Sequence, residues 1–439
     1  MNQVGEDVRI VGSDVIDGST IIASDGAGRT GGAYGVLHLI DFRLLLIGLF
    51  IAQFGQAMVT VALGWELYER TASALVLGGV GLAQIIPIII LSLPAGHIAD
   101  RYDRKKIVFA ASAVLTLGSL CLAALSALHG SLFAIYGCLA VIGGANAFES
   151  PAASALVAQV IPSAMFENAM TWRSSSWQLS AVLGPAAGGF LIGLLHGATW
   201  IYVLNAIASV VFIALLVRVK TRARKTSSSS RREPIVESLK EGLRFLSGTQ
   251  VLLAAITLDL FAVLLGGATT LLPVFAKSIL HVGPFGLGWL QASASVGAVC
   301  MALVLAHRPP LTKAGPTLLI AVAGFGAATI VFGLSQSFWL SFAMLFVLGA
   351  LDNISVVIRS TLVLVRTPDE MRGRVGAVNS LFIGASNQLG GFESGLTAQL
   401  LGPVAAVAAG GVGTLLVVWL VARYWPEMRR LGSLTEPAH

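Results

Sequence analysis

Five ionisable side chains lie inside long apolar segments of this sequence. They are Glu149, Asp259, Asp352, Arg359 and Glu393. A charge at the centre of a bilayer costs about 2.5–3.5 kcal/mol on insertion scales, so each of these residues is a functional candidate by default. A carboxylate in a low-dielectric cavity can bind a proton and later release it. These residues therefore have the chemistry that proton-coupled transport requires.

The spacing of these residues suggests two groups. Asp352 and Arg359 are seven residues apart, which predicts that they share one helix face about 10 Å apart along the axis. Asn146 and Glu149 likewise share a face. Arg359 has an alternative interpretation as a long side chain that extends to the membrane surface, and Glu393 as a residue near the outer interface. Asp352 and Glu149 are the strongest candidates.

The composition indicates that membrane helices position these residues. Of 439 residues, 56% are hydrophobic and 11% are charged, against about 25% charged in an ordinary soluble chain. The mean hydropathy is +0.83. A spanning helix needs about 20 apolar residues, and twelve segments meet this requirement. We expect helices at 43–67, 74–98, 107–128, 132–160, 172–195, 199–217, 250–274, 285–306, 315–334, 338–364, 375–399 and 403–423. The sequence therefore predicts an all-α membrane protein with twelve transmembrane helices.

Polar segments divide the chain. The stretch 1–42 is rich in Gly, Ser and Asp without periodicity, and is expected to be a disordered cytoplasmic tail. The only long gap between helices contains RVKTRARKTSSSSRREP. We therefore expect an N-terminal six-helix half at 43–217, a basic cytoplasmic linker at 218–249, a C-terminal six-helix half at 250–424 and a cytoplasmic tail at 425–439.

The distribution of basic residues predicts the orientation. With both termini inside, 25 of the 28 Lys and Arg residues fall on the cytoplasmic side, and only Arg70 and Lys277 fall outside. This asymmetry predicts a multi-pass membrane protein with both termini in the cytoplasm. It also explains the pI of about 9.4 without nucleic acid as a partner.

The sequence contains an internal repeat at a separation of 206 residues. The matched pairs include Gly143 with Gly349, Pro162 with Pro368, Met165 with Met371, Gly184 with Gly390 and Gly189 with Gly395. The Pro and Met matches fall in short polar loops, where chance agreement is less expected. The same separation sets Gln53 opposite Asp259 and Asn146 opposite Asp352. The repeat predicts two pseudo-symmetric halves.

The loop after the second predicted helix carries the most specific motif, GHIADRYDRKK at 96–106. It resembles the signature loop of the major facilitator superfamily. The resemblance implies the major facilitator fold and a cytoplasmic gate in which Asp100 docks at the start of the eleventh helix. The gate residues would be Gly96, Asp100, Arg101, Arg104, Lys105, Arg372 and Arg374. The alternative is an ordinary solvated cluster at the membrane edge.

The resemblance also implies a cavity between the halves, lined by the first, fourth, seventh and tenth helices. The polar residues on these helices are the predicted proton and substrate site. They are Gln53, Gln56, Asn146, Glu149, Asp259, Asp352, Asn353 and Arg359.

Small residues recur in the fifth predicted helix. Gly184, Pro185, Gly188 and Gly189 resemble the Gly-Pro-rich motif of antiporters in this superfamily. Such residues also let two helices approach closely, with no bearing on transport. Both interpretations stay open.

Motifs that are typical of other classes of protein are missing from the sequence. The sequence has no GxxxxGK[ST] phosphate loop and no HExxH, so neither an ATP-driven pump nor an enzyme, a metal site or a cofactor is expected. The glycines in GPFGLGW at 283–289 are expected to form a turn.

The loop motif, the basic linker and TPDEMRGRVGAVNS at 367–380 resemble the siderophore and multidrug exporter branch, which includes the enterobactin exporter. This resemblance predicts a monomer in the lipid bilayer of the cell inner membrane that exports an amphipathic small molecule, a drug-like compound or a siderophore, by proton-coupled alternating access. Alternatives are a lysophospholipid flippase, an uptake permease, or a receptor or scaffold without transport.

Overall fold

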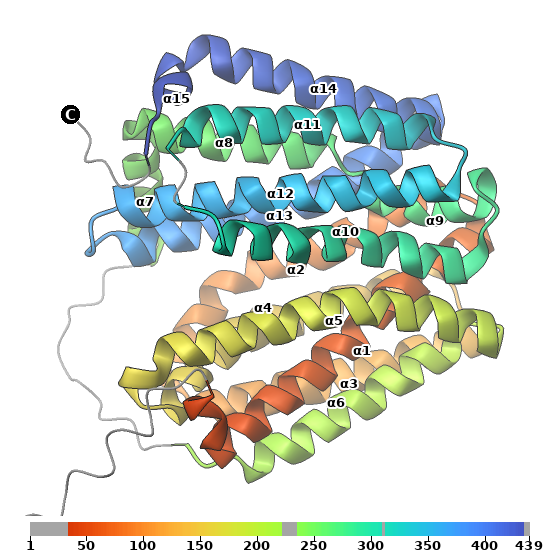
Figure 1. The fold of residues 1–439 in the computed structure, drawn as a ribbon. Coiled ribbons are helices and arrows are strands. Elements are labelled where there is room, and N and C mark those ends of the chain that lie inside the picture. The colour runs from red at the N-terminus through yellow and green to blue at the C-terminus, as the bar shows by residue number, and fades with distance from the viewer. Residues whose placement is uncertain (1–33, 222–234, 310–311, 434–439) are drawn as a thin grey trace, which may run out of the picture.

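The computed structural model describes residues 34–221, 235–309 and 312–433, which form a bundle of long helices (Figure 1). The first six long helices are α1 (Ile40–Thr71), α2 (Ala74–Arg101), α3 (Arg104–Ala127), α4 (Leu132–Val160), α5 (Phe166–Leu195) and α6 (Thr199–Arg218). The second six are α8 (Gln250–Leu265), α10 (Gly283–Ala306), α11 (Ala314–Leu334), α12 (Phe338–Arg366), α13 (Arg372–Leu401) and α14 (Pro403–Tyr424). The predicted all-α class and twelve long helices are confirmed.

The helices are suited to a bilayer. Within the described residues, eleven spans are long and apolar enough to cross a membrane, and α13 is not among them. It has sufficient length but carries many polar residues, including Asn387, Gln388 and Glu393. Large apolar side chains such as Phe133 and Trp339 are exposed on the outside of the bundle, where lipid replaces water as the solvent. The protein is a multi-pass membrane protein.

The seventh predicted helix is broken, which the sequence did not predict. α8 ends at Leu265, and Gly266 and Gly267 follow. The chain then forms a 3-10 helix η3 (Ala268–Leu271), the short α9 (Leu272–Val274) and a π-helix η4 (Phe275–Ile279). Two adjacent glycines weaken a helix, and Pro273 provides no N–H for continuing it. This break places Thr269 and Thr270 at the interface between the halves.

The expected turn at 283–289 is wrong. This stretch is the beginning of α10, with Pro284 in the first turn. Proline fits that position because the first N–H groups of a helix have no intrahelical partner. Within residues 283–289, only Gly283 has a positive φ, of 68°. Of the glycines that follow, Gly288 packs against Gly189 of α5.

The segments outside the two predicted six-helix halves contain short helices in their described parts. Residues 1–33, 222–234 and 434–439 lie outside the described part. A 3-10 helix η1 (Gly35–His38) precedes α1, and the linker contains α7 (Ile235–Gly248). The C-terminal segment forms α15 (Pro426–Arg430), and the backbone N–H of Gly315 donates to the Leu431 carbonyl at 3.2 Å.

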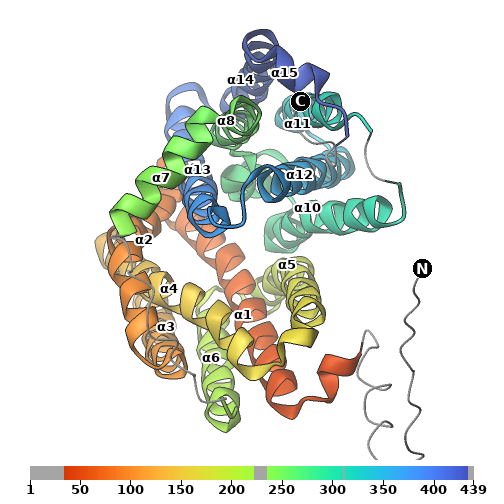
Figure 2. The ribbon, with the colours of Figure 1, turned by 90° about the vertical axis from the view of Figure 1, so that its left-hand side faces the viewer.

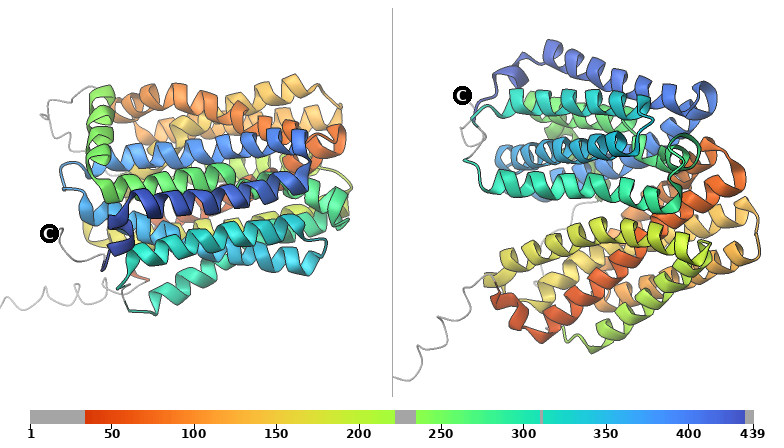
Figure 3. Two further views of the ribbon diagram at one scale, coloured as in Figure 1. Left: turned by 90° about the horizontal axis from the view of Figure 1, so that it is seen from above. Right: turned by 45° about the vertical axis from the view of Figure 1, so that its right-hand side comes forward.

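The helices form two groups that meet along two seams. Helices α1–α6 pack on one another, as do α8–α14, and the groups touch mainly through α5 with α10 and α2 with α13 (Figure 2). We call the end where α7 and α15 lie the linker face, and the end where α1 finishes and α10 begins the opposite face. The two halves diverge toward the linker face and meet at the opposite face (Figures 1 and 3).

Close glycine contacts confirm the predicted internal repeat. A Cβ placed on Gly189 of α5 would lie 2.8 Å from Cα of Gly288, and a Cβ on Gly395 of α13 would lie 2.9 Å from Cα of Gly78. Gly189 and Gly395 are 206 residues apart, whereas Gly78 and Gly288 are 210 apart. The two seams therefore have equivalent geometry.

The predicted motif of small residues in α5 lies at two helix contacts. Gly184 and Gly188 pack against Ala57 and Met58 of α1, Gly189 packs against α10, and Pro185 is buried. This geometry accounts for the motif by helix packing. Its predicted relation to antiport stays untested.

We expect Gly189→Ala to destabilise the protein, because the new methyl group would meet the backbone of Gly288. Overpacking of this kind costs about 1–3 kcal/mol, partly offset by the better helix propensity of Ala, worth up to about 1 kcal/mol. The control is Gly193→Ala, one turn along α5, where the nearest atom is 3.8 Å away. Melting temperatures of the purified variants should fall for Gly189→Ala alone. Equal melting temperatures for the two variants would show that α5 and α10 are loosely packed at this contact.

Candidate substrate cavity

A cavity of about 470 Å³ lies between the two halves, within the 300–1,000 Å³ typical of small-molecule sites. Helices α1 to α6 contribute one wall. Helices α10 and α13 and the broken segment η3–α9 contribute the other. Of the residues predicted to line a central cavity, only Gln56 does so. Polar side chains that the prediction missed also line it, namely Thr60, Gln84, Ser119, Asn205, Thr269, Thr270, Gln291, Ser295 and Gln388.

Three other predicted residues line an adjoining cavity of about 220 Å³ inside the first half. They are Gln53, Asn146 and Glu149, and this cavity shares Gln56 and Asn205 with the central one. The Glu149 carboxylate accepts a hydrogen bond from Ser112 at 3.2 Å. Arg173 lines the same cavity and donates to Ser154 at 2.9 Å. Arg173 could have been found in the sequence, because it is the only basic residue of α5.

The remaining predicted charges lie in the core of the second half. Asp259 and Asp352 border a small cavity of about 10 Å³ between α8, α11 and α12. Arg359 forms an ion pair with Asp259, and the two residues are 5% and 7% exposed. The partner of Arg359 is therefore on another helix, and is not Asp352 seven residues earlier. The nearby Asn353 has a buried Oδ1 without a hydrogen-bond partner among the described residues.

Asn146 and Asp352 occupy equivalent positions, as the repeat predicts. The matching contacts are those of Gly143 with Gln84 and of Gly349 with Ala294. The two glycines are 206 residues apart, as are Asn146 and Asp352. The 220 Å³ cavity of the first half therefore has its counterpart in the 10 Å³ cavity of the second.

The predicted equivalence of Gln53 and Asp259 is wrong. The matching contacts on α1 and α8 are those of Phe54 with Gly184 and of Val263 with Gly390. Phe54 and Val263 are 209 residues apart, so Gln53 corresponds to Ala262. Loops of different length shift the register between repeats, and a single ungapped alignment misses this shift.

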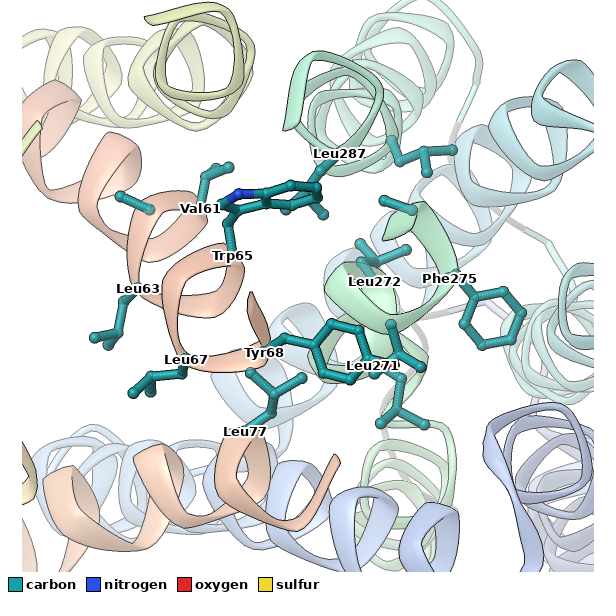
Figure 4. Packing of buried hydrophobic residues seen from close by; sticks show 14 of the residues in the cluster. Val61, Leu63, Trp65, Leu67, Tyr68, Leu77, Leu271, Leu272, Phe275 and Leu287 are labelled. Carbon is teal, nitrogen blue, oxygen red and sulfur yellow. The ribbon is translucent and has the colours of Figure 1, made fainter. Parts of the chain in front are cut away.

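Contacts between α1 and the broken segment close the cavity at the opposite face. The hydroxyl groups of Tyr68 and Ser278 are 2.8 Å apart. Lys277 lies 3.5 Å from the Glu69 carboxylate and 5.5 Å from the centre of the Trp65 ring. In Figure 4, Tyr68 and Trp65 point toward an apolar cluster that includes Leu271, Leu272 and Leu287. We call Trp65, Tyr68, Glu69, Lys277 and Ser278 the clasp.

A buried ionic group near the clasp was also missed. Glu66 is 8% exposed, pairs with Arg70 one turn later, and accepts a hydrogen bond from Tyr202 at 2.7 Å. Arg70 also donates to the Ser126 carbonyl at 2.8 Å. This carbonyl lies in the last turn of α3, where the helix dipole favours a cation. The four-residue spacing of Glu66 and Arg70 in the sequence could have predicted this pair.

The predicted cytoplasmic gate is described in part. The backbone of α2 is helical through Asp100 and Arg101, but their side chains lie outside the described residues. At the start of α13, Arg374 forms an ion pair with Glu241 of α7, and Arg372 pairs with Asp369.

Two other residues of the predicted gate, Arg104 and Lys105, bond to backbone carbonyl groups of the first half. Arg104 donates to the Ala155 carbonyl at 3.2 Å, and Lys105 to the Val219 carbonyl at 2.7 Å. A Cβ on Gly96 would meet no heavy atom within 4 Å. The gating role of these residues stays a prediction.

Residues 32–434 match the family of transmembrane secretion effectors, MFS_3. The chain belongs to this family. It is therefore a major facilitator transporter of the secretion type and not an enzyme, and the alternative of a receptor or scaffold is set aside.

Curated relatives are full-length matches at low identity. The chain is 25% identical to the multidrug efflux pump Tap of Mycolicibacterium fortuitum over 90% of this chain and 98% of the relative. It is 27% identical to the enterobactin exporter EntS of Shigella boydii serotype 4 over 89% and 92%. Among solved structures, the nucleoside transporter NupG (D323A mutant) superposes with a TM-score of 0.71 at 12% identity, covering 88% of this chain and 100% of that one. A bacterial homologue of the human lysosomal transporter Spinster gives 0.70 at 16%, covering 91% and 99%. These structures establish the major facilitator fold.

We expect Asp259→Asn to destabilise the protein, because it leaves the Arg359 charge buried without its counter-ion. Breaking a buried pair in this way costs about 3–5 kcal/mol. Adding Arg359→Gln should recover most of this loss. The control is Asp352→Asn, which removes a carboxylate from the same cavity but not from the ion pair. Thermal unfolding of the four purified proteins tests this. A loss with Asp352→Asn as large as with Asp259→Asn would mean that Arg359 depends on both carboxylates.

Proposed function

We propose that this protein exports an amphipathic small molecule across the cell inner membrane by alternating access, as a monomer driven by protons. The observation that carries the proposal is the cavity of about 470 Å³ between two halves that the clasp joins at one face. The printed functions of two relatives, multidrug efflux and enterobactin export, support an outward direction. An uptake permease or a lysophospholipid flippase would share this architecture, and the direction of flux distinguishes them.

The distribution of charge supports a cytoplasmic linker face. Lys105, Arg104 and Arg374 lie there, together with Lys240 and Arg244 of α7. Arg70 and Lys277 lie at the opposite face. Basic residues next to spanning helices are retained on the cytoplasmic side, so the clasp would face outward and the divergent ends of the halves inward.

Glu149 is the best-placed candidate for proton coupling. Its cavity adjoins the substrate cavity through Gln56 and Asn205, so a proton on Glu149 and a substrate next to Gln56 can influence each other. Asp352 borders the equivalent cavity in the second half, which is almost filled. We propose Glu149 as the coupling carboxylate and Asp352 as a second proton site.

We expect Glu149→Gln to abolish proton-driven accumulation while leaving substrate exchange intact, because the amide cannot be protonated in the physiological range. Inverted vesicles with an imposed proton gradient, supplied with chloramphenicol or ethidium, measure the accumulation. Counterflow without a gradient measures the exchange. Glu167→Gln, an exposed carboxylate at the start of α5, is the matched control.

Wild-type vesicles that accumulate neither probe would contradict the proposed export. Normal accumulation by a well-expressed Glu149→Gln protein would assign coupling to another group, and Asp352→Asn would then be compared in the same assay.

The clasp should stabilise the state that is closed to the outside. Replacing Tyr68 with Phe and Lys277 with Gln removes a hydrogen bond of about 0.5–1.5 kcal/mol and an exposed ion pair of at most about 1 kcal/mol. Together these losses should shift the population roughly tenfold toward the outward-open state.

The measurement is labelling of Ser295→Cys, on a background without the native cysteines Cys121, Cys138 and Cys300, by an impermeant thiol reagent added outside. Labelling should be faster in the double variant than with Lys277→Arg, which retains the charge. Unchanged labelling would mean that the apolar cluster alone closes this face.

A further inference from the structure

The two walls of the central cavity differ in chemistry. The wall from the second half is dominated by uncharged polar side chains, namely Thr269, Thr270, Gln291, Ser295 and Gln388. The wall from the first half is mostly apolar, with Leu77, Val80, Leu115, Leu122, Leu139 and Ile142 among its residues. A ligand that satisfies both walls must itself have an apolar side and a side rich in hydrogen-bonding groups.

Four of the five side-chain amides that line the cavity are available for a ligand, and the fifth, Asn205, donates to the Ser119 hydroxyl at 2.8 Å. The side-chain amides of Gln56, Gln84, Gln291 and Gln388 make no hydrogen bond to any residue in the described part of the chain. Gln388 is accommodated by Gly81, since a Cβ there would lie 2.9 Å from its Oε1. Each amide presents a donor and an acceptor. Such groups match amides and hydroxyls in a ligand, which also donate and accept.

Charge is excluded from this cavity. Among the residues that the structure describes, no Asp, Glu, Lys, Arg or His lines it. Glu149 and Arg173 line the adjoining cavity instead, and each already has a hydroxyl partner, Ser112 and Ser154 respectively. A bound ion would lose its hydration without meeting an opposite charge, and this loss is costly.

We propose that the central cavity selects an electroneutral amphiphile rich in amide and hydroxyl groups. These groups would contact Gln291 and Gln388, and the apolar part would lie against the first half. The inference rests on the proposed export function and specifies its substrate class. Organic cations and anions are the competing classes, and the test compares them directly.

The test measures binding to the purified full-length protein at pH 7 with three probes of similar size. Chloramphenicol is uncharged and carries an amide and two hydroxyls, ethidium is a cation, and carboxyfluorescein is an anion. We expect chloramphenicol to bind at least ten times more tightly than either ion. Gln291→Leu and Gln388→Leu should each weaken chloramphenicol binding about tenfold, because they remove hydrogen bonds without adding charge.

The matched control is Asn387→Leu. Asn387 neighbours Gln388 on α13, but it is exposed, bonds to its own helix at the Ile383 carbonyl, and does not line the cavity. Gln388→Glu provides a second, independent arm. A carboxylate in this wall should increase ethidium affinity at least tenfold and decrease chloramphenicol affinity, because it supplies the charge that the cavity lacks.

Preference of the wild-type protein for either ion, absence of chloramphenicol binding, or insensitivity to both leucine variants would overturn this assignment. Different results would contradict the proposed export function and the proposed substrate class. Chloramphenicol bound in the predicted order but never transported would contradict export alone, whereas ethidium transported independently of Gln291 and Gln388 would contradict the substrate class alone.

Discussion

Contact between backbones along two seams is the constraint on which the rest of the structure depends. At Gly189 with Gly288, and at Gly395 with Gly78, the helices approach so closely that a Cβ would meet the backbone of the neighbouring helix. Within a bilayer, apolar side chains gain little by moving from lipid to protein, so close packing must hold the halves together. The cavity occupies the space that these two seams leave between them.

The bilayer also explains why charged side chains lie away from the central cavity. A charged side chain within the membrane is stabilised by an oppositely charged partner. The two side chains of such a pair fill the space between their helices. Asp259 and Arg359 satisfy each other in the core of the second half, as do Glu66 and Arg70 near the clasp. Groups satisfied within the protein are not available to a ligand. The cavity therefore retains groups that a ligand can satisfy, which are amides and hydroxyls.

The two halves share a backbone plan but differ in chemistry. Asn146 and Asp352 are equivalent, yet one borders a cavity of about 220 Å³ and the other a cavity of about 10 Å³. The first half thus provides space next to its carboxylate, Glu149, and most of the apolar wall. The second half provides a compact ionic core, a broken helix with two threonines that line the cavity, and the polar wall. This division assigns different tasks to the halves within one symmetric scaffold.

The sequence by itself determined the all-α membrane class, the twelve helices and the repeat, because hydropathy and helix length are local properties that a bilayer imposes on each segment. It also identified five of the charges within the predicted helices, although it missed Glu66. Only the tertiary structure decided which of them meet, since Arg359 pairs with Asp259 across two helices and not with Asp352 on its own. Glutamines such as Gln291 and Gln388 gave no signal of their own. A glutamine side chain carries no charge that marks it in the sequence, and its role depends on which cavity the packing of other helices directs it into.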